Sequence, residues 1–413
     1  MNHMNVVVVG HVDHGKSTVI GRLLADTDSL PEGKLEDLRE FCKSKARSFE
    51  YAFLTDALRE ERAQGITIDT SRLFFKTTQR NYQIIDAPGH FEFLKNMISG
   101  AARADAAFLT IDAKEGITEN TLRHAYMLSF LSIQQIAILI NKMDLVDNRE
   151  DVFLSLASEI KKYLASHSVY PKYFIPISAY LGENIARASK QITWYVGPTV
   201  LEALDSFKLG LSVDSKPFRL AVQDLYDDVI VGRVSSGTLK VGDEVVAFPG
   251  NKRANIKSIL GTKNFVAISG QSIGITLNGQ IKVKRGDILC SARETLPLTL
   301  QELYGNLIWL GQKPLNIGQT CTIKLGTQRC LAKLEEIFRC LHSRNLHRSE
   351  AHKKQIQQNE VATCRFSLSS QISFDVGSEF IDSNRFVLVD NHCIAGGGLI
   401  IDHSTMPEIT TTN

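Results

Sequence analysis

The sequence predicts an α/β domain with a mostly parallel sheet and helices on both faces, followed by two β-barrel domains. In the first half of the chain, continuous runs of Val, Ile and Leu alternate with stretches of helical periodicity. That pattern is typical of a parallel sheet whose two faces are both covered. From about residue 208, shorter alternating strands with closely spaced glycines predict a small antiparallel barrel, and a second β-rich unit runs from about residue 300 to 402. We expect domains at residues 1–209, 210–297 and 298–413.

The composition is that of a soluble globular protein. The chain has 413 residues, which predicts two or three domains, and it is 43% hydrophobic and 22% charged. A formal net charge of +2 gives no strong field, so we expect no membrane partner and no general binding of nucleic acid. The seven cysteines are scattered, and a strand begins almost at the first residue. We therefore expect a cytoplasmic protein without disulfides, zinc or a signal segment.

Each element is expected from its own pattern of apolar residues. In the first domain we expect strands at residues 6–9, 82–86, 106–111, 136–140 and 173–177, and helices at 91–100, 120–130 and 153–164. In the second we expect strands at 218–223, 229–234, 243–247, 256–259 and 281–284, after a linker at 210–216. In the third we expect strands at 307–310, 321–325, 361–367, 385–389 and 398–401. We interpret the basic stretch 339–354 as a solvated loop.

A phosphate-binding loop directly follows the strand at residues 6–9. It has the pattern G-x-x-x-x-G-K-[ST] and precedes a helix start with an apolar period. Its two glycines allow the tight turn that points backbone N–H groups at phosphate oxygens. Lys16 can reach the β- and γ-phosphates, and the Ser17 hydroxyl can ligate Mg²⁺. The residues expected to bind the nucleotide in this loop are Gly10, His11, Val12, Asp13, His14, Gly15, Lys16, Ser17 and Thr18.

An Asp-x-Pro-Gly motif ends the strand at 82–86, at the edge where open α/β sheets bind ligands. We expect Asp86 to hold Mg²⁺ through water and the Gly89 N–H to bond a γ-phosphate oxygen. A glycine at this position also lets the peptide flip when that phosphate leaves. His90 is then expected to face the attacking water.

An Asn-Lys-x-Asp motif follows the strand at 136–140 and predicts a guanine pocket. Asp144 can accept hydrogen bonds from N1–H and the exocyclic amine of guanine, a pair of donors that adenine does not present. Asn141 is expected to support the loop and to contact the base, and the stem of Lys142 can lie along the face of the base. Ser178 and Ala179, after the next strand, are expected to supply a backbone N–H to the guanine oxygen. The nucleotide expected is GTP.

The segment between the first two motifs contains Gly65-Ile66-Thr67-Ile68-Asp69. Thr67 can place its hydroxyl on Mg²⁺ and its backbone N–H on the γ-phosphate, so we expect this segment to order only with triphosphate bound. The expected metal ligands are Ser17, Thr67 and Asp86. The residues expected to carry hydrolysis are Lys16, Thr67, Gly89 and His90.

With these four motifs the chain resembles the translation-factor-like GTPases over essentially its whole length. The resemblance implies an α/β phosphate-loop GTPase domain followed by two β-barrel domains, and hydrolysis of GTP with Mg²⁺. It also implies that His90 orients the hydrolytic water and that Thr67 and Gly89 carry the switches.

Two branches of this family are resembled in different parts of the chain. His11, His14 and Ala87 are similar to elongation factors that deliver aminoacyl-tRNA. Segments of the third domain are similar to the large, GTP-hydrolysing subunit of heterodimeric sulfate adenylyltransferase, namely 307–315, 318–319, 383–390 and 395–400. The second resemblance implies a chain whose GTP hydrolysis drives formation of adenylyl sulfate from ATP and sulfate by a small catalytic partner subunit. Delivery of aminoacyl-tRNA and a diverged GTPase switch are the alternatives.

Overall fold

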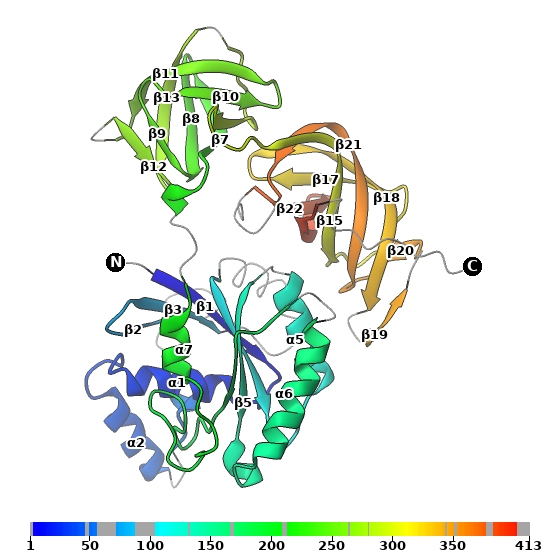
Figure 1. The fold of residues 1–413 in the computed structure, drawn as a ribbon. Coiled ribbons are helices and arrows are strands. Elements are labelled where there is room, and N and C mark those ends of the chain that lie inside the picture. The colour runs from blue at the N-terminus through cyan, green and yellow to red at the C-terminus, as the bar shows by residue number, and fades with distance from the viewer. Residues whose placement is uncertain are drawn as a thin grey trace. The chain divides into compact units, whose positions relative to one another are not determined.

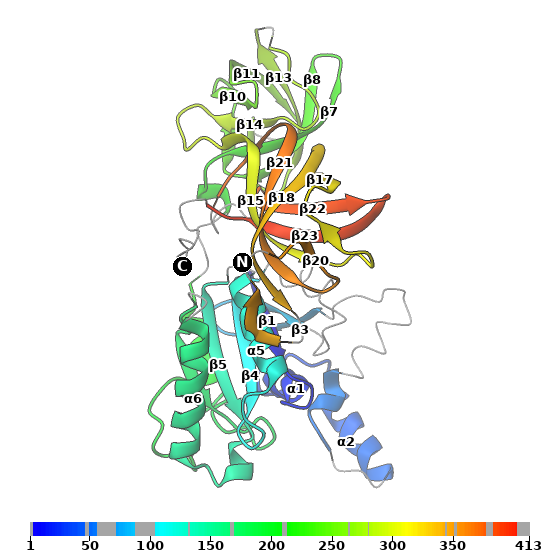
Figure 2. The same cartoon turned by 90° about the vertical axis from the view of Figure 1, so that its right-hand side faces the viewer.

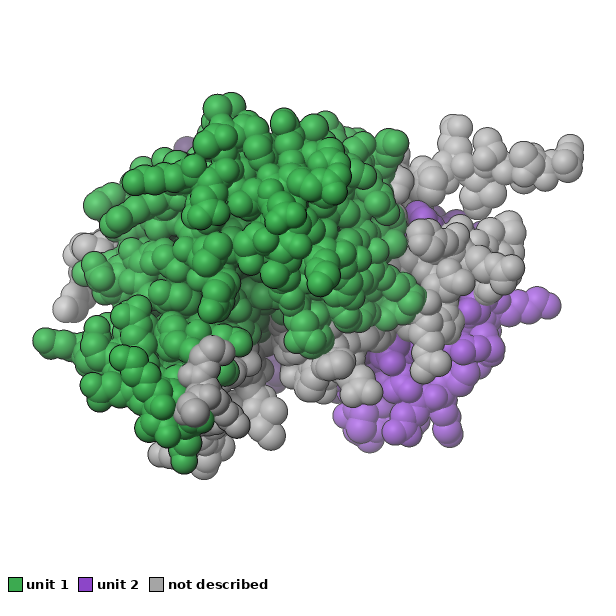
Figure 3. Space-filling model, turned by 90° about the horizontal axis from the view of Figure 1, so that it is seen from below, with its two compact units in different colours: residues 1–209 green, residues 210–413 purple. Residues whose placement is uncertain are grey.

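The computed structural model divides into two compact units, Met1–Leu209 and Gly210–Asn413 (Figure 3). It describes residues 3–45, 49–55, 72–86, 104–130, 133–165, 169–208, 213–262, 265–279, 281–342, 345–350, 353–376 and 383–402. The expected helix at 91–100 and the first three residues of the expected linker at 210–216 lie outside the described residues, and the rest of the linker contains a short 3₁₀ turn at Val213–Ser215. The predicted boundaries of the three domains stay a prediction.

The first unit is built on a six-stranded sheet with the order β2-β3-β1-β4-β5-β6 (Figure 1). All neighbouring strands are parallel except β2, which pairs antiparallel with β3 at the edge. The mostly parallel sheet is therefore confirmed. The strands are β1 (His3–Gly10), β2 (Arg72–Lys76), β3 (Asn81–Asp86), β4 (Ala106–Asp112), β5 (Gln135–Asn141) and β6 (Tyr173–Pro176).

Helices cover both faces of this sheet, as predicted. Their bounds are α1 (Lys16–Asp26), α2 (Lys34–Ser44), α5 (Glu119–Phe130), α6 (Glu150–Ala165) and α7 (Val200–Ser206). Figures 1 and 2 both show α1 and α6 on opposite sides of the sheet. Successive strand side chains point to opposite faces, so Val6 and Val8 pack in one core with α1 and α7. Val7 and Val9 are equally buried but face the other side. The continuous valine run is explained by this double burial.

The second unit begins with a closed barrel of six strands in the order β10-β11-β13-β8-β7-β14. Its strands are β7 (Arg219–Tyr226), β8 (Val229–Ser236), β10 (Glu244–Phe248), β11 (Lys252–Leu260), β13 (Ser272–Asn278) and β14 (Ile288–Ser291), beside a small pair, β9 (Thr238–Lys240) and β12 (Val266–Ile268). The strand predicted at 281–284 is wrong. Backbone N–H of Lys284 donates to Asp287 Oδ2, and Asp287 N–H donates back to the Lys284 carbonyl. The chain turns there, and β14 closes the barrel.

A second barrel follows in the order β17-β22-β23-β15-β21-β18, closed by an additional β17–β18 pairing. Its strands are β15 (Leu298–Trp309), β17 (Thr320–Leu325), β18 (Gln328–His342), β21 (Val361–Phe374), β22 (Arg385–Asp390) and β23 (Cys393–Ile400), with β19 (Asn345–Glu350) on β18 and a short pair, β16 (Leu315–Asn316) and β20 (Gln355–Ile356). The solvated loop predicted at 339–354 is wrong, because the end of β18 and all of β19 lie within it. The end of β18 pairs with β21, and β19 pairs with β18, so backbone hydrogen bonds order this stretch as strands.

Six of the seven cysteines are buried, and Cys393 is exposed.

None of the helices in the described part of the chain is long and apolar enough to cross a membrane.

Candidate nucleotide-binding site

Buried polar residues collect at the carboxyl edge of the parallel sheet. β1, β3, β4 and β5 end at or next to Gly10, Asp86, Asp112 and Asn141. Strand register brings them together, because Val8 lies opposite Asp86 and Asp112 lies opposite Asn141. The last three of these end residues are at most 5% exposed. The structure thus brings Gly10, Asp86 and Asn141, which belong to three predicted motifs widely separated in the sequence, to one edge.

The loop between β1 and α1 has the form of an anion cradle. Gly15 is the N-cap of α1 with φ of +85°, and no side chain caps the helix start. A Cβ at Gly15 would collide with the side-chain nitrogen of Asn141, so only glycine fits. Lys16 Nζ donates to the carbonyls of Gly10 at 2.8 Å and His11 at 2.7 Å. The uncapped helix end and the ammonium group together favour a phosphate.

The two histidines of this loop face β4 and the residues after it. His14 is fully buried, with Nδ1 3.2 Å from the Thr110 carbonyl and Nε2 3.2 Å from a Glu115 oxygen. Burial lowers the pKa of His14 and outweighs the opposite effects of Thr110 and Glu115. His11 Nδ1 lies 2.9 Å from the side-chain nitrogen of Asn120. These contacts brace the phosphate loop against β4 and the start of α5.

Asn141 connects the phosphate loop to the loop after β6. Its side-chain nitrogen donates to the His14 carbonyl at 2.9 Å, and its oxygen accepts the Ala179 N–H at 3.0 Å. The Ser178 N–H donates to the Glu183 carbonyl at 3.2 Å. The backbone N–H groups of Ser178 and Ala179, which are predicted to bind guanine, therefore both donate within the protein. Their contact to the base stays a prediction.

Asp144 carries an unsatisfied acceptor. It lies in the 3₁₀ turn Met143–Val146, and its Oδ1 is buried without a hydrogen-bond partner among the described residues. A buried carboxylate oxygen without a partner is costly, so such an atom indicates a site for a ligand donor. Trp194 contacts the chain just after this turn, where its Nε1 donates to the Asn148 carbonyl at 2.8 Å. This arrangement fits the N1–H and amine of guanine.

Two of the three predicted Mg²⁺ ligands, Ser17 and Asp86, are among the described residues. Asp86 is 4% exposed and ends β3, and Ser17 is the second residue of α1. A carboxylate and a hydroxyl beside a phosphate loop fit the oxygen ligands that Mg²⁺ prefers. Thr67, Gly89 and His90 lie outside the described residues, and their roles stay predictions.

Sequence reasoning missed two side chains at this edge. Asp112 Oδ2 lies 2.7 Å from Lys142 Nζ, and Glu115 contacts His14. The sequence contained a signal for Asp112, because this residue directly follows the strand predicted at 106–111. A polar residue in that position belongs to the same edge as Asp86 and Asn141.

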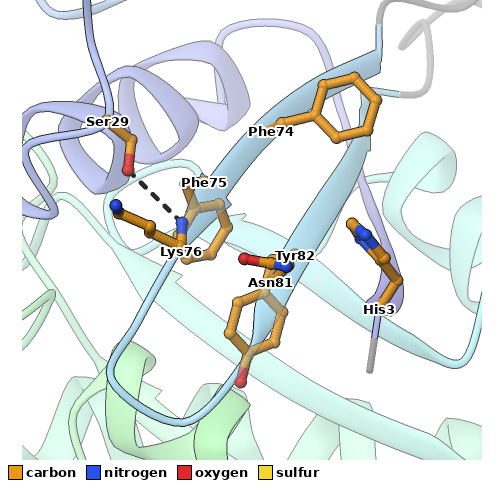
Figure 4. Close-up of a pocket in the computed structure, with 7 residues that line it drawn as sticks. All are labelled: His3, Ser29, Phe74, Phe75, Lys76, Asn81 and Tyr82. Carbon is orange, nitrogen blue, oxygen red and sulfur yellow. Dashed lines mark hydrogen bonds between the residues drawn. The ribbon is translucent and has the colours of Figure 1, made fainter. Parts of the chain in front are cut away.

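An open hollow of about 410 Å³ lies elsewhere on this unit (Figure 4). It is lined by His3, Ser29, Phe74, Phe75, Lys76, Asn81 and Tyr82. His3 and Asn81 begin β1 and β3, so the hollow lies at the amino edge of these strands, away from the phosphate loop. The stacked rings of Phe75 and Tyr82, 4.8 Å apart, give it an aromatic wall.

Comparison with known proteins identifies the family. The model of the elongation factor Tu GTP binding domain matches residues 1–209. The models of elongation factor Tu domain 4 and of the GTP-eEF1A C-terminal domain-like family match residues 219–290 and 302–401.

Relatives from two branches match at similar levels. Sulfate adenylyltransferase subunit 1 of Aeromonas hydrophila subsp. hydrophila is 33% identical over 412 residues, covering 97% of this chain and 86% of that protein. Elongation factor 1-alpha of Methanocorpusculum labreanum is 35% identical over 413 residues, covering 97% of each. A solved structure of sup35 complexed with GDP aligns with 97% of this chain and 94% of its own at 21% identity and a TM-score of 0.45.

The sheet, its phosphate loop and the matched GTP-binding domain define a phosphate-loop GTPase. The chain belongs to the translation-factor family of GTPases, with an elongation factor Tu-type GTP-binding domain followed by two β-barrel domains. The resemblance seen in the sequence is thereby confirmed at the level of the family.

Proposed function

We propose that this chain is the GTP-hydrolysing subunit of a sulfate adenylyltransferase. In this proposal its GTP hydrolysis drives a small catalytic partner to form adenylyl sulfate and pyrophosphate from ATP and sulfate. The observation that carries it is the likeness of third-domain segments such as 307–315 and 395–400 to that subunit. The Aeromonas relative bearing that name, which aligns with 97% of this chain, supports it. The proposal places the chain in the cytoplasm.

The guanine site rests on the residues at the carboxyl edge. Asp144, with its unpartnered Oδ1, accepts the two guanine donors, while Asn141 holds the surrounding loops. The remaining residues proposed to contact the nucleotide are Gly10, His11, Val12, Asp13, His14, Gly15, Lys16, Ser17, Thr18, Asp86, Gly89, Lys142, Ser178 and Ala179. Specificity for guanine follows because a nucleotide without those donors leaves a buried carboxylate unpaired.

Hydrolysis proceeds by in-line attack of water on the γ-phosphorus, breaking its bond to the β–γ bridging oxygen and releasing GDP and phosphate. Lys16 leaves its carbonyl partners to neutralise charge on the transferred group, together with backbone N–H groups of the loop. His90 orients the water, and Thr67 and Gly89 report the γ-phosphate. Ser17, Thr67 and Asp86 would hold Mg²⁺, which would supply charge neutralisation for the phosphates of the nucleotide.

Delivery of aminoacyl-tRNA is the second candidate. The likeness of His11, His14 and Ala87 to elongation factors favours it, as does the similarity to elongation factor 1-alpha. Against it, segments of the third domain such as 383–390 are similar to the sulfate adenylyltransferase subunit, and the net charge of +2 is nearly neutral. A diverged GTPase switch would bind GTP and support neither reaction.

The deciding experiment measures pyrophosphate release from ATP and sulfate by this chain with its copurified partner. The arms contain GTP, GDP, a nonhydrolysable GTP analogue or no guanine nucleotide. We expect product to accumulate beyond its unaided equilibrium only with GTP, and Lys16→Ala to abolish this effect. Asp151→Asn, in an exposed ion pair with Arg149, is the matched control and should behave as wild type.

The same preparations are tested for protection of aminoacyl-tRNA from ester hydrolysis in the presence of GTP. Protection without GTP-dependent pyrophosphate release would replace the proposal by the elongation-factor function. Guanine-nucleotide binding with neither activity would leave the diverged switch.

A further inference from the structure

Lys142 adopts a constrained conformation in the guanine motif. Its φ of 61° lies in the left-handed region that residues with a side chain seldom occupy. Its side chain is 32% exposed, yet its ammonium does not extend into solvent. The long, mobile side chain of a lysine needs a partner to stay in one orientation.

That partner is Asp112, at the end of β4. Asp112 Oδ2 lies 2.7 Å from Lys142 Nζ, and the carboxylate side chain is 8% exposed. Its Oδ1 accepts the backbone N–H groups of Lys114 at 2.8 Å and Glu115 at 3.2 Å. Burial raises the pKa of Asp112, but Lys142 and the two N–H groups outweigh it, so the net pKa is lowered. The carboxylate is therefore charged when it holds Lys142.

The loop at residues 113–116, which Asp112 holds in place, also contacts the phosphate loop. The Asp112 carbonyl accepts the Gly116 N–H at 2.8 Å, and the Ala113 N–H donates to the Asn141 carbonyl at 2.8 Å. Glu115, held in the same turn, lies 3.2 Å from the buried His14 of the phosphate loop. One carboxylate thus holds both the lysine of the guanine motif and the loop that braces the phosphate loop.

Resting on the proposed guanine site, we propose that Asp112 is a positioning residue for nucleotide binding, acting through Lys142. It anchors the ammonium so that the aliphatic stem is already extended where the guanine face lies. A side chain ordered before binding loses less freedom on binding, which raises affinity without a direct contact. The effect applies equally to GDP and GTP, because both carry the same base.

The test is a double-mutant cycle in the full-length chain, with Kd for GDP and GTP measured with a fluorescent nucleotide. The variants are Asp112→Asn, Lys142→Met and the double variant. Since a charge-assisted hydrogen bond is lost, we expect Asp112→Asn to weaken both nucleotides about tenfold or more. Once Lys142 is methionine, Asp112→Asn should have almost no further effect. In Asp112→Asn, the kcat of GTP hydrolysis at saturating GTP should equal that of the wild type, while KM for GTP rises.

Two controls separate positioning from folding. Asp112→Ser keeps an acceptor for the Lys114 N–H without the charge, and it replaces Asp112→Asn if that variant fails to fold. Asp151→Asn removes an exposed carboxylate of the same unit and should leave Kd unchanged.

Each remaining outcome has one meaning. Wild-type affinity in Asp112→Asn, or equal weakening in the wild-type and Lys142→Met backgrounds, overturns the inference. Failure of the wild-type chain to bind guanine nucleotides would instead contradict the proposed function.

Discussion

Arg219 and Asp375 form a buried, two-pronged ion pair between the two barrels of the second unit. Arg219, the first residue of β7, donates to Asp375 through Nε at 3.0 Å and Nη2 at 2.8 Å. Both side chains are 3% exposed. The guanidinium also donates to the carbonyls of Thr295 and Phe218, and Ser383 donates to Asp375. Every charge taken from water here has partners, which a buried pair requires.

Removing one side of this pair is expected to destabilise the second unit strongly. Asp375→Ala should lower the free energy of unfolding by about 3–5 kcal/mol, because it leaves the buried guanidinium without its carboxylate counter-charge. Urea unfolding is followed by fluorescence in a Trp194→Phe background, which leaves Trp309, buried in the second barrel, as the only tryptophan. Asp151→Asn is the exposed control and should leave the midpoint almost unchanged. An equally small change in Asp375→Ala would show that the pair contributes little.

Asp144→Asn is expected to change the preferred base from guanine to xanthine. An asparagine can donate where the carboxylate accepts, so guanine loses an acceptor while the C2 oxygen of xanthine gains a donor. Kd for GDP should rise about 100-fold or more, since a charged hydrogen bond to the base is lost. Kd for xanthosine diphosphate should fall at the same time. Undiminished guanine selectivity in this variant would contradict the assignment of Asp144.

Gly15→Ala is expected to be more harmful than the same change at another helix N-cap. Gly15 and Gly33 both have positive φ, +85° and +78°, at the starts of α1 and α2. Alanine at Gly33 meets no atom within 4 Å and should cost only the backbone strain of about 1–2 kcal/mol. Alanine at Gly15 also collides with Asn141, so its cost should be larger and nucleotide affinity should fall. Calorimetric melting and GDP titration compare the two, and equal melting temperatures would mean that the loop relaxes around the methyl group.

Glu360 is expected to make stability depend on acid pH. This fully buried carboxylate lies 2.6 Å from Lys353 Nζ and accepts the Gln357 N–H at 2.7 Å. Burial raises the pKa of Glu360, but Lys353, the Gln357 N–H and Cys340 outweigh it, and the net pKa is below its usual 4.5. The folded protein thus binds this proton less tightly than the unfolded chain. Its stabilisation is complete above about pH 4.5 and is lost as pH falls through the lower folded value.

Urea unfolding of wild type and Glu360→Gln from pH 7 to pH 3 measures how the contribution of Glu360 to the free energy of unfolding depends on pH. The stability difference between them should be largest near neutral pH and shrink on acidification. A difference that grows towards pH 3 would contradict the lowered pKa.

The fold and much of the candidate site followed from local patterns. Asp86 and Asn141 were predictable because each ends an apolar strand, and parallel strands bring their ends to one edge. The strand predicted at 281–284 failed because an irregular segment buries Val283 as well as a strand would. The loop predicted at 339–354 failed because pairing with a neighbouring strand overrode the charge run. Local periodicity does not contain either of these tertiary effects.

The sequence by itself determined the nucleotide motifs, the parallel sheet that carries them and the change to two barrels. Only the tertiary structure decided which polar groups are partners: Lys142 with Asp112, His14 with Glu115, and Arg219 with Asp375. The physical reason is that strand register and burial set these pairs. A charge shielded from water must find a partner across the fold, and the chain distance between partners, 156 residues for the last pair, leaves no local trace.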